Sequence, residues 1–399
     1  MSEFSKKQDN RVRKIVQICK TLITGSITPE FYKKNKDFIN SVIPSDIVLA
    51  VDRMVLENIP LADLKKGINK LLNLLYKPIV NYNSLKPKKN TLLYYLIEDN
   101  RKASILFDSI RPILNEFNKD QNNNLKREVI EKFERFKRFE NHYIILENVL
   151  FPVIEKFVRD YRCLNLMWSY HDDIRRDLKD LLKELNKQDI DLRIVNYYSS
   201  RLFYNVFAMI FREEEILFPY ALEKINEKEL DKLLDEAMEI GFGLIEIDNK
   251  KQKTKEIDKG FADNLVKLST GELSIEQLEL IFNSLPVDIT FVDQNNKVRY
   301  FSSPEERIFP RTKSIIGRDV RNCHPPESVD TVMKIIDSFR RGEKDKADFW
   351  IRFKDKYVYI QYFAVRDSNN NYKGVLEVTM DIKDIQTIKG EKRLLDWAL

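Results

Sequence analysis

Two segments of the sequence place a histidine or a methionine a few residues ahead of glutamates and the same Leu-Phe-Pro ending. The first is HYIILENVLFP, residues 142–152, and the second is MIFREEEILFP, residues 209–219. Imidazole and carboxylate groups are ligands that iron accepts, and residues four apart on a helix point in the same direction. The repeat therefore indicates a metal site or its remnant, with Met209 standing where the first segment has His142.

The number of histidines limits what such a site could hold. The chain has only three, His142, His171 and His324. Met209 is predicted to pack rather than to bind metal, because thioethers commonly fill helical cores. Glu147 follows His142 by five residues, an interval that turns a regular α-helix by about 140°. We therefore expect Glu147, and Glu214 in the second segment, to point away from the histidine position and to act as interhelical partners or as solvated charges.

The elements that carry these residues are predicted to be helices. Apolar residues at three-to-four spacing indicate several short helices over residues 10–82, with Thr28 and Ser45 as N-caps. Four longer helical stretches between about 90 and 246 predict an antiparallel four-helix bundle. The two Leu-Phe-Pro helices would be equivalent members of two repeated hairpins.

The C-terminal part changes from helical to alternating periodicity. The charged stretch 248–260 indicates a linker, and the segments ITFVD, KVRYFS, DFWIRF, KYVYIQYFAV and VLEVTMDI predict five strands of an antiparallel sheet with a helical segment after the second. The predicted fold class is thus multidomain, with an all-α N-terminal half and an α+β C-terminal domain. Alternation predicts that one apolar and aromatic sheet face carries Ile289, Phe291, Val298, Tyr300, Phe349, Ile351, Tyr359, Gln361, Phe363, Leu376 and Val378.

Three known families resemble these regions. LPVDITFVDQNNKVRYFS, IIGRDVRNCHPP and VLEVTMDI resemble a PAS sensor domain, while HYIILENVLFP, MWSYHDDIR and MIFREEEILFP resemble the hemerythrin-like HHE cation-binding domain. The first residues are similar to an uncharacterised helical domain that commonly precedes that bundle in bacterial proteins. The expected domains are 1–82 (helical domain), 88–247 (bundle), 248–275 (linker), 276–388 (PAS domain) and 389–399 (helical tail).

The hemerythrin resemblance implies a di-iron site with five imidazoles and two bridging carboxylates. In that family each Leu-Phe-Pro helix carries a histidine ten residues before the proline and a glutamate four residues after the histidine. This chain departs from the pattern at Leu146 and Met209, and its opening bundle helix offers no imidazole. The ligand positions that remain are His142, His171 and Glu213, too few for two irons.

Three readings of the bundle site follow. Its histidines could be hydrogen-bonded core residues in a domain without metal. A single iron or zinc could be held by His142, His171 and a carboxylate from Glu213 or Glu98. Heme between the two histidines, or a metal completed by a second chain, is the third reading.

The PAS resemblance implies heme, flavin or a small metabolite between the sheet and the helical side of the domain. His324 is then a candidate axial ligand, with a turn histidine bonded to a backbone carbonyl as the alternative. Tyr359, Gln361 and Tyr300 are candidates for ligand recognition, because a buried polar group requires a partner.

The rest of the sequence narrows the class of function. A net charge of +5 from interleaved basic and acidic residues does not indicate nucleic-acid binding, and no apolar run reaches the length of a membrane span or signal peptide. No nucleophile–base pair, phosphate loop or paired acid site is recognisable. We expect a non-catalytic cytoplasmic sensor or adaptor that forms a homodimer through the PAS domain or terminal helices and acts on a separate output protein. An iron-binding protein that senses or handles oxygen, nitric oxide or iron, and a scaffold with an empty PAS domain, are the alternatives.

Overall fold

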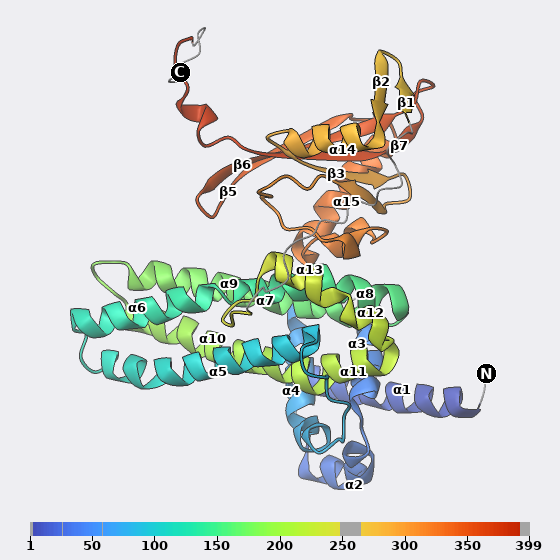
Figure 1. Cartoon of the computed structure of the whole chain (residues 1–399). Helices are drawn as coiled ribbons and strands as arrows, with labels where there is room; N and C mark the ends of the chain where they lie inside the picture. The colour runs from blue at the N-terminus through green and yellow to red at the C-terminus, as the bar shows by residue number, and fades with distance from the viewer. Residues whose placement is uncertain (1–2, 26, 58, 248–264, 392–399) are drawn as a thin grey trace. The chain divides into compact units, whose positions relative to one another are not determined.

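The structure is a computed structural model of the 399-residue chain, and it describes residues 3–25, 27–57, 59–247 and 265–391 (Figure 1). These residues form two compact units that divide between residues 248 and 249. Within the described ranges, no helix is both long and apolar enough to cross a bilayer. The predicted linker stretch 248–260 and most of the predicted C-terminal tail lie outside the described residues.

The first unit begins with the short helices expected from the periodicity: α1 (Glu3–Thr24), α2 (Pro29–Asn40), α3 (Pro44–Val55) and α4 (Leu61–Val80). Thr28 caps α2, as predicted. Ser45 does not cap α3, because that helix begins one residue earlier and the Asp46 carboxylate accepts the backbone N–H of Ile43. The Ser45 hydroxyl instead donates to Glu223 at 2.8 Å.

The predicted four-helix bundle is confirmed, and Figure 1 shows α5, α6, α9 and α10 running side by side. Both Leu-Phe-Pro helices are divided by a π-helical turn. The elements are α5 (Leu92–Phe117), α6 (Asn123–Lys137), α7 (Glu140–Ile145), the π turn η1 (Leu146–Leu150), α8 (Phe151–Phe157), α9 (Cys163–Leu185), α10 (Leu192–Arg212), the π turn η2 (Glu213–Leu217), α11 (Phe218–Lys224), α12 (Glu227–Asp231) and α13 (Leu233–Ile240).

A continuous apolar core joins the short helices to the bundle. Ion pairs reinforce the junction: Lys65 contacts Asp173 at 2.6 Å, and Asp52 accepts both the backbone N–H and the guanidinium of Arg162. The expected boundary between residues 82 and 88 therefore falls inside one compact unit.

The second unit has the predicted α+β architecture. Its five-stranded antiparallel sheet has the order β4-β3-β7-β6-β5, so β7 is the central strand. Residues 265–274, expected as linker, instead form a hairpin. The elements are β1 (Leu265–Leu268), β2 (Gly271–Ser274), α14 (Ile275–Ser284), β3 (Asp288–Asp293), β4 (Val298–Phe301), η4 (Lys313–Ile315), η5 (Val320–Cys323), α15 (Pro326–Arg340), β5 (Lys346–Phe353), β6 (Lys356–Arg366), β7 (Tyr372–Asp381) and η6 (Ile385–Thr387).

The strand register corrects the predicted sheet face. The face that packs under α15 carries Val292, Val298 and Val375 of the core, and period-two alternation adds Thr290, Glu377, Thr379, Ile360, Tyr362, Phe349 and Ile351 to it. Ile289, Phe291, Tyr300, Tyr359, Gln361, Phe363, Leu376 and Val378 lie on the opposite face. The prediction of one shared face was wrong for Val298, Phe349 and Ile351, because a β-bulge between Phe291 and Val292 shifts the pairing with β4 and because β6, the partner of β5, is apolar on both faces.

Candidate functional site

The π turns place the acidic residues of the bundle. The Phe151 N–H donates to the Leu146 carbonyl, and the Phe218 N–H donates to the Glu213 carbonyl, each across five residues. A proline inside a helix cannot donate and crowds the carbonyl four residues earlier, so the turn ahead of each Leu-Phe-Pro ending opens into a π turn. The extra residue in each turn changes which side chains face the core.

His142, on α7, lies fully buried between two carboxylates. Its Nδ1 is 3.3 Å from Asp99 Oδ2 and its Nε2 is 3.0 Å from Glu213 Oε2. Burial alone would lower the pKa of His142, but the charges and hydrogen bonds of Glu213 and Asp99 outweigh burial and raise it to about 9. His142 is therefore an imidazolium that donates from both ring nitrogens at neutral pH.

Asp99 and Asn100, on α5, complete this cluster. The Asp99 carboxylate also accepts the backbone N–H groups of residues 243, 244 and 245 at 3.1, 2.6 and 3.1 Å. A Cβ added at Gly243 would lie 2.8 Å from the Cα of Phe139, so only glycine fits there. Asn100 Nδ2 donates to Glu213 Oε2 at 2.9 Å.

The sequence prediction selected Glu98 where the structure uses Asp99. Glu98 lies toward the surface and pairs with Arg101 at 2.7 Å, so it does not join His142. Helical phase could have identified the correct residue. Leu96, Ala103 and Phe107 are buried on α5, and their three-to-four spacing includes Asp99 but not Glu98.

A second buried cluster surrounds Glu147, on the first π turn. Glu147 accepts from His171 Nδ1 at 2.8 Å and from Arg175 Nη2 at 3.0 Å. Burial would raise the pKa of Glu147, but Arg175 and His171 lower it below its usual value, so the side chain is a carboxylate. As predicted, Glu147 does not pair with His142, but the π turn directs it into the core, toward His171, rather than into solvent. Its alternative role as an interhelical partner is confirmed.

The equivalent positions of the second Leu-Phe-Pro helix differ. Met209 is buried in the apolar core, as predicted. Glu214 is half-buried, and burial raises its pKa to about 7. The two repeats thus carry different chemistry at matching positions.

The donor set does not fit a pair of irons. A metal ligand must offer a lone pair, and both nitrogens of His142 are directed at carboxylates. His171 directs Nδ1 at Glu147 and keeps only Nε2. Among the residues that the structure describes, no group of three or more histidine, cysteine or acidic side chains is arranged to hold a metal ion. Several buried atoms of the bundle have no hydrogen-bond partner among the described residues, and those of the two clusters are His171 Nε2, Glu213 Oε1, Asn100 Oδ1 and the Tyr143 hydroxyl.

In the PAS unit, His324 follows η5 and lies two residues before the start of α15. Its Nδ1–H donates to the Val320 carbonyl at 2.9 Å, which is the turn arrangement considered as an alternative. Burial lowers the pKa of His324, so the imidazole is neutral and its Nε2 keeps a lone pair.

The other three predicted PAS residues lie on the sheet face opposite α15. The Tyr359 hydroxyl donates to Asp348 at 2.7 Å in an exposed position, and Gln361 shares that face. Tyr300 packs against Phe282 of α14, with ring centroids 5.6 Å apart. The structure therefore brings only His324 to the α15 side, where a polar row that sequence reasoning missed crosses three strands: Thr290, Glu377 and Tyr362.

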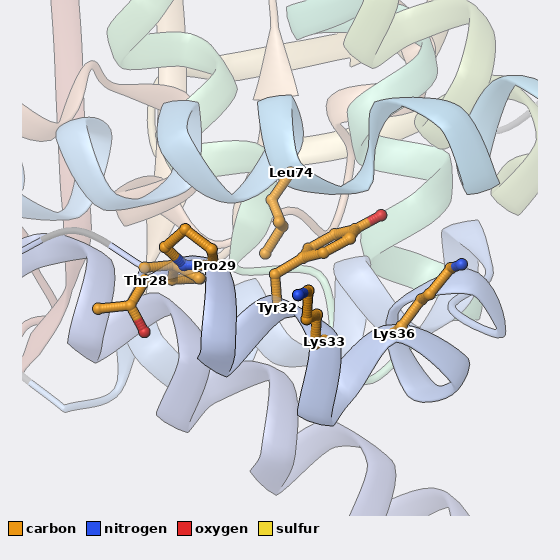
Figure 2. Close-up of a pocket in the computed structure, with 7 residues that line it drawn as sticks. Thr28, Pro29, Tyr32, Lys33, Lys36 and Leu74 are labelled. Atoms are coloured by element: carbon orange, nitrogen blue, oxygen red, sulfur yellow. The ribbon is translucent and has the colours of Figure 1, made fainter.

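A surface pocket of about 540 Å³ lies between α2 and α4 in the first unit (Figure 2). Tyr32 and Leu74 give it an apolar floor, and Lys33 and Lys36 stand beside it. It contains none of the predicted site residues.

Comparison with known proteins agrees with both modules. Residues 91–221 match the model of the hemerythrin HHE cation binding domain, and residues 278–383 match that of a PAS domain. The chain is therefore a multidomain protein with one region similar to each of these two families. More particularly, it joins an HHE bundle with an N-terminal helical region to a PAS domain.

Three solved structures resemble the chain over about a third of its length or less. The C-terminal domain of a Streptococcus mutans protein is 38% identical over 31% of this chain and 96% of that one, with a TM-score of 0.30. A PAS domain from Colwellia psychrerythraea is 18% identical over 27% of this chain and 97% of that chain, with a TM-score of 0.23. The PAS domain of Bordetella pertussis BvgS is 16% identical over 27% of this chain and 85% of that chain, with a TM-score of 0.23. Comparison with curated proteins gives no match.

Proposed function

We propose that this chain is a non-catalytic cytoplasmic sensor or adaptor in which the PAS domain binds a small ligand and the bundle relays the signal without a metal. The observation that carries the metal-free relay is the position of His142, whose two ring nitrogens each face a carboxylate. A protonated imidazole there supplies the positive charge that a metal would otherwise supply to Asp99 and Glu213. The imidazolium offsets one of the two carboxylate charges, and three backbone N–H groups also bind Asp99.

The PAS domain supports the ligand-binding role through its interior side. Thr290, Glu377 and Tyr362 place polar groups on the sheet face that packs under α15. Polar groups inside a domain require partners, and a bound ligand can provide them.

The signal then passes to a partner. Helix α14 has no buried residue and exposes Leu280 and Ile281 at 59% and 45%. This apolar face supports a homodimer through the PAS domain, with a separate output protein receiving the signal.

Spectroscopy and metal analysis of the full chain test this proposal. The protein is purified with and without air, and its absorption spectrum, metal content and melting temperature with and without a chelator are recorded. We expect less than stoichiometric metal and a melting temperature that the chelator leaves unchanged. An intense heme band lost in His324→Ala would identify heme as the PAS ligand, whereas one tightly held iron or more per chain would contradict a metal-free bundle.

A second candidate function is supported by the unpartnered buried atoms. His171 Nε2, Glu213 Oε1 and Asn100 Oδ1 could hold one iron or zinc, in a protein that senses or handles oxygen, nitric oxide or iron. Titration with Fe²⁺ or Zn²⁺ separates the candidates: metal at 100 times its Kd would stabilise a true site by about 2.7 kcal/mol. His171→Ala should abolish that gain if the site exists, while His324→Ala serves as the matched control.

A further inference from the structure

Two opposite charges on the α15 side of the PAS sheet lack partners. Glu377 lies on β7, and Arg311 lies in the loop that precedes η4. Both side chains are half-buried. Neither forms an ion pair or a hydrogen bond with any residue in the described ranges, and they do not pair with each other. A half-buried charge without a partner is costly, so this arrangement requires an explanation.

The sheet register fixes the position of Glu377. Val375 and Thr379, two residues before and after it, are buried at 4% and 1%, so the three side chains share the core-facing side of the central strand. Its direct cross-strand neighbours are Tyr362 on β6 and Thr290 on β3. The carboxylate therefore lies in the middle of the sheet face.

The loop that carries Arg311 is held against the same face. Asp288 accepts the backbone N–H groups of Ile308 and Phe309 at 2.8 and 3.4 Å, and Arg307 approaches Asp288 at 3.8 Å. Asp288 pairs with Thr379, two residues along β7 from Glu377. The loop is thus bound to Asp288, which lies one side-chain position along the sheet face from Glu377.

Electrostatic interactions connect both charges to two further groups. Burial raises the pKa of the Tyr362 hydroxyl, Glu377 raises it further and Arg311 lowers it. Burial lowers the pKa of His324, Glu377 raises it, and Arg311 and Arg318 lower it. Glu377, Arg311, Tyr362 and His324 therefore lie within electrostatic reach of one another on one side of the sheet.

We propose that this cluster binds a small zwitterion of the α-amino acid type, with its ammonium group on Glu377 and its carboxylate on Arg311. A guanidinium matches a carboxylate through two parallel hydrogen bonds, and a carboxylate accepts readily from an ammonium group. The Tyr362 hydroxyl and His324 Nε2 add hydrogen-bonding groups. A simple cation or anion would neutralise one charge and leave the other without a partner. The inference rests on the proposed role of the PAS domain as a ligand-binding module and names the ligand class.

Calorimetry and thermal shift on the full chain test this inference. The probes are the individual L-amino acids, each with two matched derivatives: the N-acetyl form, which lacks the ammonium group, and the methyl ester, which lacks the carboxylate. We expect at least one amino acid to bind and both of its derivatives to bind at least about tenfold more weakly, the size expected for losing one charged contact. Arg311→Gln and Glu377→Gln should each cost a similar factor, while Tyr359→Phe, on the opposite face, should bind like the wild type.

The outcomes separate this inference from the proposed function. A derivative that binds as tightly as its parent amino acid, or variants at 311 and 377 that bind normally, overturns the zwitterion site. Heme or flavin binding that is lost in His324→Ala but kept in Arg311→Gln also overturns it, while the sensor role stands. If the folded protein binds none of the amino acids, the zwitterion site is wrong, while the sensor role with another small ligand stands.

Discussion

The bundle interior and the PAS interior both contain charged side chains, but they treat them differently. In the bundle, His142 meets Asp99 and Glu213, and Glu147 meets His171 and Arg175. In the PAS domain, Glu377 and Arg311 have no partner among the described residues. Charges that are paired within the fold are closed to a charged ligand, whereas charges without a partner can bind one. The predictions below test whether the bundle is closed in this sense, from the largest expected effect to the smallest.

Replacing Asp99 should have the largest effect on the bundle. Asp99→Ala removes the acceptor of three backbone N–H groups and one of the two carboxylates at His142. We expect a loss of about 4 kcal/mol in the free energy of unfolding, because buried donors and a buried cation lose their partner. Urea unfolding followed by far-UV circular dichroism, which the helical unit dominates, measures it. Glu98→Ala, one residue earlier and near the surface, should stay within about 0.5 kcal/mol; equal losses would contradict the assignment.

Stability should depend on pH through His142. Its pKa is about 9 in the folded chain against 6.5 for the free side chain, so its stabilising contribution is complete below pH 6.5 and is lost as the pH rises through 9. The contribution is about 3 kcal/mol. The stability difference between wild type and His142→Gln should therefore shrink as the pH rises from neutral to about 10. A difference that stays constant over this range would show that His142 is neutral.

Glu147→Gln should be moderately destabilising. The amide keeps the size of the side chain but loses the ion pair with Arg175, which should cost about 2 kcal/mol at a buried position. Glu140→Gln is the matched control, because Glu140 lies 3.8 Å from the same arginine in a partly exposed position. Chemical denaturation at neutral pH compares them, and similar losses would place Glu147 outside the buried network.

Glu214→Gln should slightly stabilise the protein above neutral pH. Burial raises the pKa of Glu214 to about 7 from 4.5, so its ionisation destabilises the folded state increasingly above pH 4.5 and fully above about pH 7. Because the side chain is partly solvated, we expect a gain of about 1 kcal/mol or less at high pH and none in mild acid. Melting temperatures at the two pH values provide the measurement; a loss at both would indicate a specific partner for the carboxylate.

Tyr359→Phe should have the smallest effect. Its hydroxyl donates to Asp348 in an exposed position on the outer face of the PAS sheet. Such a bond is worth less than about 0.5 kcal/mol. Thermal melting should show little change, and a loss comparable to that of a core residue would mean that the outer face is covered.

The architecture of both modules could be predicted from the sequence because long helical and alternating periods depend on many residues. The second half of the bundle site could not be predicted in the same way. Glu147 faces the core through a π turn, and the five-residue interval from His142 has a different meaning there than on a regular helix. The choice of Glu98 was avoidable, because the three-to-four spacing of the buried residues on α5 includes Asp99 and not Glu98.

The PAS sheet shows where alternation fails. The segment KYVYIQYFAV is apolar or aromatic at nearly every position, so its period does not distinguish the two faces, and a bulge beside Val292 shifts the neighbouring strand. Arg311 lies on a loop, where no period applies, and the position of that loop depends on its hydrogen bonds to Asp288.

Asp99 contacts both His142 and the backbone of residues 243–245, so it links the charge inside the bundle to the last described residues of the helical unit. The same carboxylate binds the interior cation and three backbone N–H groups near the end of the helical unit. Because a side chain at position 243 would clash with Phe139, the backbone of residues 243–245 can lie against Asp99 only with glycine at that position. A change in the charge or position of His142 would therefore act, through Asp99, on the backbone of residues 243–245.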